Sequence, residues 1–399
     1  MRLPDADCVL VRHGEIGTKS DQVRRRMEGR LADNVSALLA DRGVDGEVER
    51  RRYRLVVHTA EPGRACEAAT DAFGVVSASP ATRAEPTLDS MADELARVAR
   101  HCYEEGPCDG GSFAVRANRA GGPEAHEFSS RDIGEAGGDA VWDAVEAAGY
   151  DPAVDLDDPD VAFHVDCRGS VAFVFAEKRE GPGGMPLGTQ DPLVALVSGG
   201  IDSPVAAWRA MKRGCPVVPL YVGLGDFGGV DHQARALSTV EDLSTYAPNY
   251  DTRLRFAPAA DAVADIADAV EVGRMVVLRR FMFAVAERVA RNEGAAGIVT
   301  GEVVGQKSSQ TAANLAVTSA ATDLPVHRPL LTEDKTDLTA VARAIGTFED
   351  STIRAGCDRL APEYPETRAD RADIEAREPD DLFERAAAVA DAVELLDRE

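Results

Sequence analysis

Residues 195–208, ALVSGGIDSPVAAW, contain the most informative motif of the chain. An apolar run ends at two glycines, an aspartate and a serine, and a helix-like run follows at once. Gly199 and Gly200 allow backbone N–H groups to approach a bound anion closely, and Ser198 and Ser203 can add hydroxyl donors. The pattern predicts a phosphate-binding corner between a buried strand and the N-terminus of a helix.

Asp202 lies within this corner and would repel a phosphate unless a cation lay between them. It therefore indicates Mg²⁺, bridging the carboxylate to the phosphates of a nucleotide. The corner is not a Walker A loop, because it has no G-K-[ST], and it is not the dinucleotide motif G-x-G-x-x-G. A plain glycine turn with Asp202 or Ser203 as helix cap is the alternative, and the full six-residue pattern favours phosphate binding.

The region from about residue 191 alternates buried-type strands with helices. The strands are PLVALVS, CPVVPLYVG and GAAGIVTG, and the helices are PVAAWRAMKRG, VVLRRFMFAVAERVARNEG and DLTAVARAIG. Such alternation is typical of an α/β fold with a doubly wound parallel sheet, whose ligand binds at the carboxyl ends of the strands. In the C-terminal tail, Leu382, Ala386, Val389, Val393 and Leu396 have helical spacing, which predicts one acidic helix with a packed face.

Two α+β regions precede this sheet. Residues 1–60 show a strand, a long helix and a strand, and residues 61–178 mix helices with strands, ending in a hairpin at Arg168–Ser170. The segment REGPGGMPLGTQDP that follows holds four glycines and three prolines in 14 residues, so we place a linker at 179–190. The remainder, 191–399, forms the third domain.

The charge of the chain is strongly negative. It has 69 acidic and 44 basic residues and a formal net charge of -25. A surface of this kind fits a cell with a very salty interior. Net charge does not exclude a nucleic-acid partner, because a local arginine patch can still bind phosphates. We find no apolar run of membrane-spanning length and no signal peptide at the start, and we expect a cytoplasmic protein without membrane contact.

The seven cysteines form no disulfide-like framework and no C-x-x-C pair. We expect reduced thiols throughout. Cys8, Cys167 and Cys215 lie in or beside strands and are expected in the core. Cys102 and Cys108 lie near His101, but their spacing is poor for zinc, so we interpret them as structural.

Eight ordered motifs resemble the tRNA 4-thiouridine synthetase (tRNA sulfurtransferase) family. They are VRHGEIGTKS, FGVVSASPA, FAVRANR, GPGGMPLGT, SGGIDSPVAAWRAMKRG, GEVVGQKSSQTAANL, DLPVHRPLL and APEYPETR, and they are distributed along nearly the whole chain. The resemblance implies a ferredoxin-like domain, a THUMP RNA-binding domain and an ATP pyrophosphatase (PP-loop) domain, matching the three regions. It also implies an enzyme that uses ATP to adenylate a tRNA uridine carbonyl and replaces its oxygen with sulfur, releasing AMP and pyrophosphate.

By the same resemblance, the phosphate corner consists of Ser198, Gly199, Gly200, Asp202 and Ser203. Further nucleotide contacts carry over to Val194, Ala195, Tyr221, Val222, Arg279, Gly301 and Gln310. Independently, Gly301 begins a second polar loop, GEVVGQKSSQ, at the end of an apolar run, so two loops are expected to face one crevice.

Two further residues are candidates for catalysis. Only five lysines occur beside 39 arginines, and all lie in or next to the motifs, which suggests point charges that arginine cannot replace. Lys335 matches a family lysine near the phosphates, and we expect it to stabilise the transition state, with a solvated helix-start lysine as the alternative. Cys357 follows a glycine in a polar stretch, as an accessible thiolate would, and matches the family's active-site cysteine.

The partners follow from the same reasoning. Arg116 and Arg119 on one strand, and Arg24 and Arg25 in a basic helical patch with Arg26 and Arg30, are candidates to bind tRNA phosphates, although they could instead pair with neighbouring acids. Neither a rhodanese domain nor a C-x-x-C pair is evident, so the sulfur donor is either sulfide or a partner's persulfide. Whether Cys357 holds an iron–sulfur cluster and whether the protein forms a homodimer both stay open. The alternatives for function are sulfur transfer to the thiamine thiazole, thiolation at another tRNA position, and an RNA-binding protein with a decayed catalytic domain.

Overall fold

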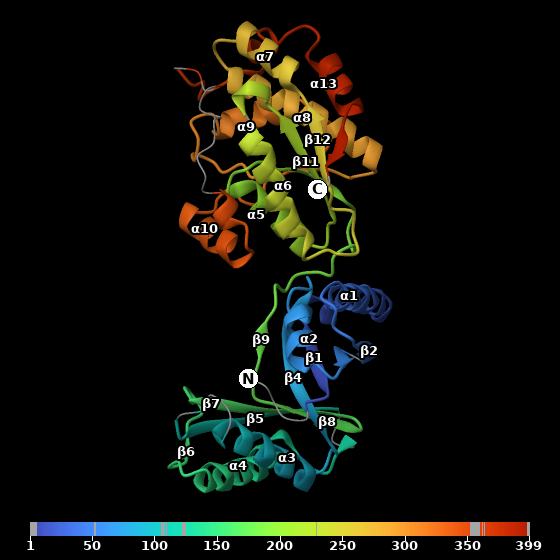
Figure 1. Cartoon of the computed structure of the whole chain (residues 1–399), viewed down its shortest axis with the longest axis vertical. Helices are drawn as coiled ribbons and strands as arrows, with labels where there is room; N and C mark the ends of the chain where they lie inside the picture. The colour runs from blue at the N-terminus through green and yellow to red at the C-terminus, as the bar shows by residue number, and fades with distance from the viewer. Residues whose placement is uncertain are drawn as a thin grey trace. The chain divides into compact units, whose positions relative to one another are not determined.

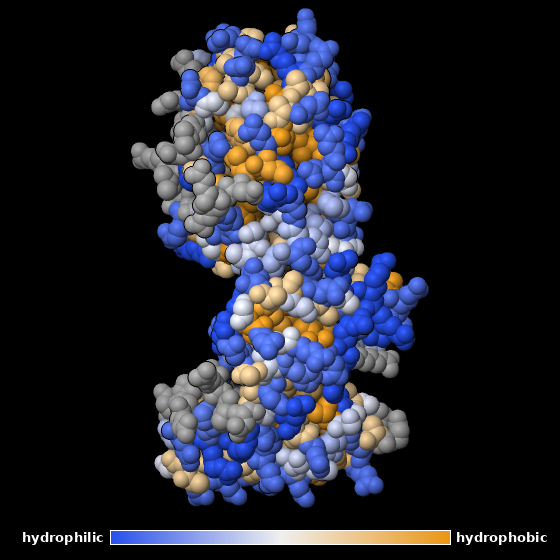
Figure 2. Space-filling view, turned by 45° about the vertical axis from the view of Figure 1, so that its right-hand side comes forward, coloured by the Kyte–Doolittle hydropathy of each residue, from blue (hydrophilic) through white to orange (hydrophobic). Residues whose placement is uncertain are grey.

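The computed structural model divides the chain into two compact units, Met1–Pro186 and Leu187–Glu399 (Figure 1). Within them the structure describes residues 6–51, 53–104, 108, 110–121, 125–228, 230–351, 360, 362 and 364–396. Most of the face shown in Figure 2 is hydrophilic, as the acidic composition predicts, and its largest gathering of hydrophobic residues lies on the C-terminal unit.

The N-terminal unit is built on one nine-stranded sheet. Its strand order is β2-β3-β1-β4-β8-β7-β5-β6, and β9 pairs with β4. The strands are β1 (Cys8–His13), β2 (Glu47–Arg51), β3 (Arg54–His58), β4 (Val75–Ala84), β5 (Ser112–Ala120), β6 (Ala153–Val154), β7 (Val161–Arg168), β8 (Val171–Phe175) and β9 (Arg179–Glu180). Because β4 pairs with both β1 and β8, this strand joins the two α+β regions into a single sheet.

Two separate cores hold helices against this sheet. Helices α1 (Asp21–Asp41) and α2 (Pro62–Ala69) pack on the first core, and α3 (Leu88–Glu104) and α4 (Ser130–Ala147) pack on the second. The first core includes Cys66 of α2 and Val75 of β4, so its packing continues past the boundary expected at residue 60. The predicted hairpin joins β7 to β8, with Gly169 at φ 58, a left-handed conformation that glycine adopts readily.

The C-terminal unit confirms the predicted α/β architecture. Its six-stranded sheet has the order β14-β13-β10-β11-β12-β15, and the pairs from β14 to β12 are parallel. The strands are β10 (Leu193–Leu196), β11 (Val217–Gly223), β12 (Leu254–Pro258), β13 (Ile298–Val299), β14 (Val326–His327) and β15 (Glu394–Leu396).

Helices cover both faces of this sheet (Figure 1). Helices α7 (Ala260–Ala269), α8 (Arg274–Glu293) and α13 (Leu382–Asp391) share the main core with Val194 of β10. The next residue, Ala195, points to the opposite face, because side chains alternate along a strand. On that face α5 (Asp202–Lys212) and α6 (Val230–Ser244) pack against β10, β11 and β12. The remaining helices are α9 (Ala312–Ser319), α10 (Lys335–Ala344), α11 (Phe348–Ser351) and α12 (Arg371–Glu375).

The predicted C-terminal helix is confirmed over Leu382–Asp391 but does not extend to Leu396. The helix α13 ends at Asp391, and Glu394–Leu396 form β15, which pairs antiparallel with β12 in the register Leu254↔Leu396. Strand β12 would otherwise present an edge of unpaired N–H and C=O groups, and pairing with β15 satisfies them. Helical spacing of apolar residues could not reveal this edge, which only the tertiary fold creates.

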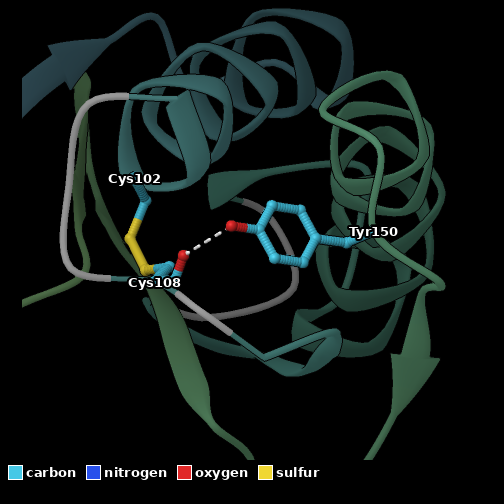
Figure 3. Close-up of a disulfide and its surroundings, with 3 residues drawn as sticks. All are labelled: Cys102, Cys108 and Tyr150. Carbon is cyan, nitrogen blue, oxygen red and sulfur yellow. Dashed lines mark hydrogen bonds between the residues drawn. A yellow bond between two sulfur atoms is a disulfide. The ribbon is translucent and has the colours of Figure 1, made fainter.

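The expectation of reduced thiols throughout is also wrong. Cys102 and Cys108 form a disulfide with their Cα atoms 5.6 Å apart, a distance that a disulfide readily bridges (Figure 3). The Tyr150 hydroxyl donates a hydrogen bond of 3.3 Å to the Cys108 carbonyl. Cys102 lies in the last turn of helix α3, and Cys108 is six residues further along the chain, a pairing that the spacing alone does not predict. Cys8, Cys66 and Cys167 are buried free thiols, and Cys215 is a partly buried one.

Candidate active site

The S-G-G-I-D-S segment forms the connection between β10 and α5, at the carboxyl end of the parallel sheet. The Ser203 hydroxyl accepts a hydrogen bond of 2.9 Å from the Ser198 N–H and donates one of 3.2 Å to the Ser198 carbonyl. These bonds fix the shape of the corner from within. Because α5 begins at Asp202, the positive end of the helix dipole lies at this corner. The corner therefore has the charge and rigidity that an anion site requires.

Two glycines of this region are needed for close packing. A Cβ on Gly199 would lie 3.0 Å from the Cβ of Arg235, a residue of α6 that is only 5% exposed. A Cβ on Gly301 would lie 2.7 Å from the backbone N of Ser203. The second polar loop therefore touches the start of α5, as the two-loop prediction requires. Arg235 brings a positive charge to the corner, and sequence reasoning missed it because nothing distinguishes it from other helical arginines.

Asp202 is partly buried at the first turn of α5. Its carboxylate accepts a hydrogen bond of 3.0 Å from the Gln306 side-chain amide. Burial raises the pKa of the Asp202 carboxyl above its usual value, and the bond from Gln306 and the charges of Lys335 and Lys307 act in the opposite direction. A bound cation would stabilise the charged form of a carboxyl group whose pKa is raised by burial. Lys335, the exposed first residue of α10, is thus close enough to act on the proposed metal ligand.

A buried ion network lies behind the second loop. Glu302 is only 4% exposed, and its carboxylate accepts a hydrogen bond of 2.9 Å from Arg328 Nε and lies 3.4 Å from Arg279 Nε. Arg279 also donates a hydrogen bond of 2.9 Å to the Ser309 hydroxyl. Burial lowers the pKa of Arg279, whereas Glu302 raises it. Glu302 therefore holds Arg279 of helix α8 against the second loop. It was not predicted, although it directly follows Gly301 in the motif.

Two cavities open beside these groups. The smaller, of about 190 Å³, is lined by the phosphate corner, by Gly301 and Glu302, and by Met282 and Phe283 of α8. The larger, of about 380 Å³, is lined by the N-terminal part of α8, residues 307–310 and residues of the 362–366 segment. Ser198, Arg279 and Gln310 belong to both walls, so the cavities adjoin. The structure thus brings together the corner, Arg279, Gly301 and Gln310, as expected.

Four other expected nucleotide contacts lie in the strands. Val194 and Ala195 are on β10, and Tyr221 and Val222 are on β11, where all four are at most 4% exposed. The walls of the two cavities do not include them. Their contact with a nucleotide stays a prediction, as does the role of Cys357, which lies outside the described residues.

The expected RNA-binding arginines differ in their surroundings. Arg24 is 4% exposed, forms ion pairs with Asp21 and Glu28, and lies 4.7 Å from the centre of the Tyr53 ring. Arg25, Arg26 and Arg30 of the same helix are exposed. Arg116 is also exposed, and Arg119 lies three positions further along β5, so their side chains point to opposite faces of the sheet. Of the predicted set, Arg25 and Arg116 are exposed, whereas Arg24 is buried and Arg119 is half-buried.

A cationic sheet face in the N-terminal unit was not predicted. It consists of Arg12, Arg54, Arg116, His164, Arg168 and Lys178, with Asp166 among them. Asp166 accepts a hydrogen bond of 2.8 Å from Arg168 and lies 3.4 Å from Arg54 Nε. Burial and the nearby charges of Arg12, Arg116 and Lys178 together lower the pKa of His164 to about 4, so this ring is neutral near pH 7 and contributes an uncharged aromatic surface to the face. Strand pairing creates this face from four separate strands, which no local motif indicates.

Some features are absent from the described residues. No group of three or more His, Cys, Asp or Glu side chains there could hold a metal ion by itself. Nor does that part of the chain contain a helix both long and apolar enough to cross a membrane.

Comparison with known families gives three consecutive matches. Residues 8–79 match the ThiI ferredoxin-like domain, residues 85–177 match the THUMP domain, and residues 188–382 match the family described as "Thiamine biosynthesis protein (ThiI)". The chain is similar to the probable tRNA sulfurtransferase of Halobacterium salinarum, with 59% identity over 97% of this chain and 96% of that one. The similar protein of Methanosarcina mazei is 38% identical over 92% and 89%.

One solved structure resembles the chain over nearly its whole length. It is the crystal structure of a 4-thiouridine synthetase–RNA complex with bound ATP, with a TM-score of 0.84, 26% identity, and coverage of 98% of this chain and 99% of that one. The order of domains, the extended matches to relatives and the corner geometry agree. The chain therefore belongs to the ThiI family of tRNA sulfurtransferases.

Proposed function

We propose that the protein uses ATP to convert a uridine of tRNA to 4-thiouridine, with AMP and pyrophosphate as products. The observation that carries this proposal is the meeting of two polar loops at the carboxyl ends of β10 and β13, where Gly301 touches the start of α5. Further support comes from the solved relative, a 4-thiouridine synthetase crystallised with RNA and ATP.

The reaction needs ATP because oxide is a poor leaving group. The uracil O4 attacks the α-phosphorus of ATP, the bond to pyrophosphate breaks, and O4 becomes part of an adenylate. A sulfur nucleophile then attacks C4, and AMP departs with the original oxygen. With sulfide as donor no oxidation or reduction occurs. With a persulfide, its terminal sulfur attacks and a second thiol then cleaves the sulfur–sulfur bond, forming a disulfide.

The chain's own groups support the first step. The N–H groups of the corner and the hydroxyl of Ser198 bind and orient the phosphates, and the dipole of α5 favours their charge. Lys335 and Lys307 are both exposed and both act on Asp202, and their charges would stabilise the negative charge that develops as pyrophosphate leaves. Asp202 fits a Mg²⁺ site because burial raises the pKa of its carboxyl, and a bound cation would favour the charged form. When bound, Mg²⁺ would neutralise phosphate charge, with phosphate oxygens supplying its remaining ligands.

For tRNA, the N-terminal unit offers the cationic sheet face. Its guanidinium groups can bind phosphates, and His164, which stacks on Phe175 at 4.9 Å, adds an aromatic surface. The chain has a net charge of -25, yet cationic residues of β1, β3, β5 and β7 lie together on this face. Such a local cluster of positive charge fits the binding of an RNA phosphate backbone.

The test is to incubate the purified protein in molar salt with unmodified tRNA, ATP, Mg²⁺ and sulfide. The RNA is then digested and analysed by mass spectrometry. We expect 4-thiouridine only when ATP is present, together with AMP and pyrophosphate. ATP turnover with no thiolated nucleoside would contradict the proposal. The family description leaves a second candidate, sulfur transfer toward the thiamine thiazole. Thiolation at another tRNA position is a third, and digestion to oligonucleotides, which keeps the position of the modified base, distinguishes it.

Cys357 is proposed to take up sulfur when the donor is a persulfide. We expect Cys357→Ser to lose nearly all thiolation with a persulfide-loaded donor, because serine can neither accept nor transfer the sulfur. The matched control is Cys215→Ser, since burial raises the pKa of the partly buried Cys215 thiol and disfavours its thiolate. The control should react normally. Full activity of Cys357→Ser with the persulfide donor would remove Cys357 from the mechanism.

A further inference from the structure

The larger of the two cavities has walls of a distinctive kind. Met275 and Val276, at the start of α8, contribute apolar surface, and so do Pro362 and Pro365. Polar groups come from the 307–310 segment and from Glu366. Cavities of roughly 300 Å³ or more with mostly apolar walls and a few polar groups are typical of sites for small organic groups. At about 380 Å³, this one is large enough for a nucleobase.

The position of this cavity relates it to the phosphate corner. It shares Ser198, Arg279 and Gln310 with the smaller cavity, whose walls include Asp202 and Gly301. Asp202 and Gly301 do not line the larger cavity. A phosphate held at the corner would therefore lie at the boundary between the two, within reach of a group that enters from the larger side.

Gln310 supplies a specific polar contact at this boundary. Its side-chain oxygen Oε1 is buried and accepts no hydrogen bond from the described residues. A buried acceptor without a donor is costly, so a ligand that supplies an N–H would be favoured there. The Gln310 backbone is fixed by two hydrogen bonds, to the Lys307 carbonyl at 2.8 Å and from the Gly305 N–H at 2.9 Å. The side chain is thus presented from a rigid turn.

We propose that the larger cavity receives the target uracil base, unstacked from the tRNA. The apolar walls from α8 and the two prolines enclose the ring. Gln310, an expected nucleotide contact that lines both cavities, then lies between the nucleotide and the base, and its Oε1 accepts the N3–H of the base. The carbonyl to be activated then points toward Ser198 and Arg279, where the α-phosphate would lie. This inference rests on the proposed function and adds to it the place of the acceptor base.

Two methionines of α8 allow a matched test. Met275 lines only the larger cavity and Met282 only the smaller one. They are seven residues apart on one helix, hence on similar faces, and both are partly buried. Substitution with tryptophan fills either cavity with a comparable change in the helix.

We expect Met275→Trp to lower kcat/KM for tRNA thiolation at least about 100-fold, because the base can no longer reach the reacting phosphate. The affinities for ATP and for tRNA should stay within about threefold of the wild-type values, because Met275 lines neither the smaller cavity beside the phosphate corner nor the cationic sheet face. Met282→Trp should instead abolish ATP binding. Equal loss of ATP binding in both variants, or normal thiolation by Met275→Trp, would overturn the assignment.

The wild-type protein supplies an independent test that needs no variant. A tRNA already carrying 4-thiouridine at the modified position is bound and illuminated, because the thiocarbonyl crosslinks to adjacent side chains. We expect the crosslinked peptide to come from 273–279, 307–310 or 362–366. Crosslinks confined to other segments would contradict the cavity as the base site. Failure of the wild-type protein to thiolate tRNA would instead contradict the proposed function, so the two failures are distinguishable.

Discussion

The variant Asp202→Asn is expected to lower the rate of tRNA thiolation by at least about 100-fold, comparable to the loss of a principal charge-stabilising group. Asparagine keeps the shape of the side chain and can still bind Gln306, but it has no charge to hold Mg²⁺ against the phosphates. Binding of tRNA should be unchanged, since the cationic sheet face belongs to the N-terminal unit. The measurement is 4-thiouridine formed per enzyme at saturating ATP, with tRNA affinity determined in the same salt.

The control is Asp261→Asn. Asp261 is an exposed acid in the first turn of α7, so it occupies the same kind of helix position but lines neither cavity. The Asp261→Asn variant should thiolate tRNA at the wild-type rate. If Asp202→Asn were as active as this control, the carboxylate would not be a metal ligand in the reaction.

The second large effect is expected from Glu302→Ala. Removing this carboxylate leaves the guanidinium groups of Arg279 and Arg328 buried without their common partner, and breaking such a buried ion network costs about 3–5 kcal/mol. Both the free energy of unfolding of the C-terminal unit and the affinity for ATP should fall, since Arg279 would no longer be held against the second loop. Urea unfolding in molar salt and equilibrium ATP binding measure the two effects.

Glu333→Ala provides the comparison. Its ion pair with Arg209 is longer, at 3.6 Å, and both side chains are about one-third exposed. Exposed pairs contribute at most about 1 kcal/mol, so this variant should unfold nearly as the wild type does. A Glu302→Ala protein as stable as Glu333→Ala would show that the buried network does not hold the second loop.

Local patterns predicted the architecture well where one element determines its own structure. The buried strand, the S-G-G-I-D-S corner and the following helix are all encoded within residues 193–212, and the structure confirms that order. The C-terminal segment shows the limit. Val393 and Leu396 fit the helical spacing, yet residues 394–396 form a strand because β12 offers an edge. The spacing of apolar residues along the chain does not show which strand a segment will pair with, and here pairing with β12 determines the structure.

The site residues that could be predicted from the sequence differ from the others in one respect. The corner residues, Gly301 and Gln310 lie in short motifs, so they could be predicted from the sequence. Glu302 and Arg235 contribute to the site because they are buried against residues distant in the sequence, and the burial of a charge cannot be predicted from a local sequence pattern. The cationic sheet face is assembled by the pairing of strands from both halves of the N-terminal unit. Cys102 and Cys108 form a disulfide that neither their spacing nor the composition of the chain indicates.

The most direct test of the account is a crystal structure of the protein with ATP or a non-hydrolysable analogue, grown in high salt. We predict that the β- and γ-phosphates lie against the N–H groups of the corner between Ser198 and Ser203, with a cation between them and Asp202. A corner that stays empty at saturating nucleotide, with its N–H groups bound to carbonyls of the protein, would show that this corner does not bind the phosphates of ATP.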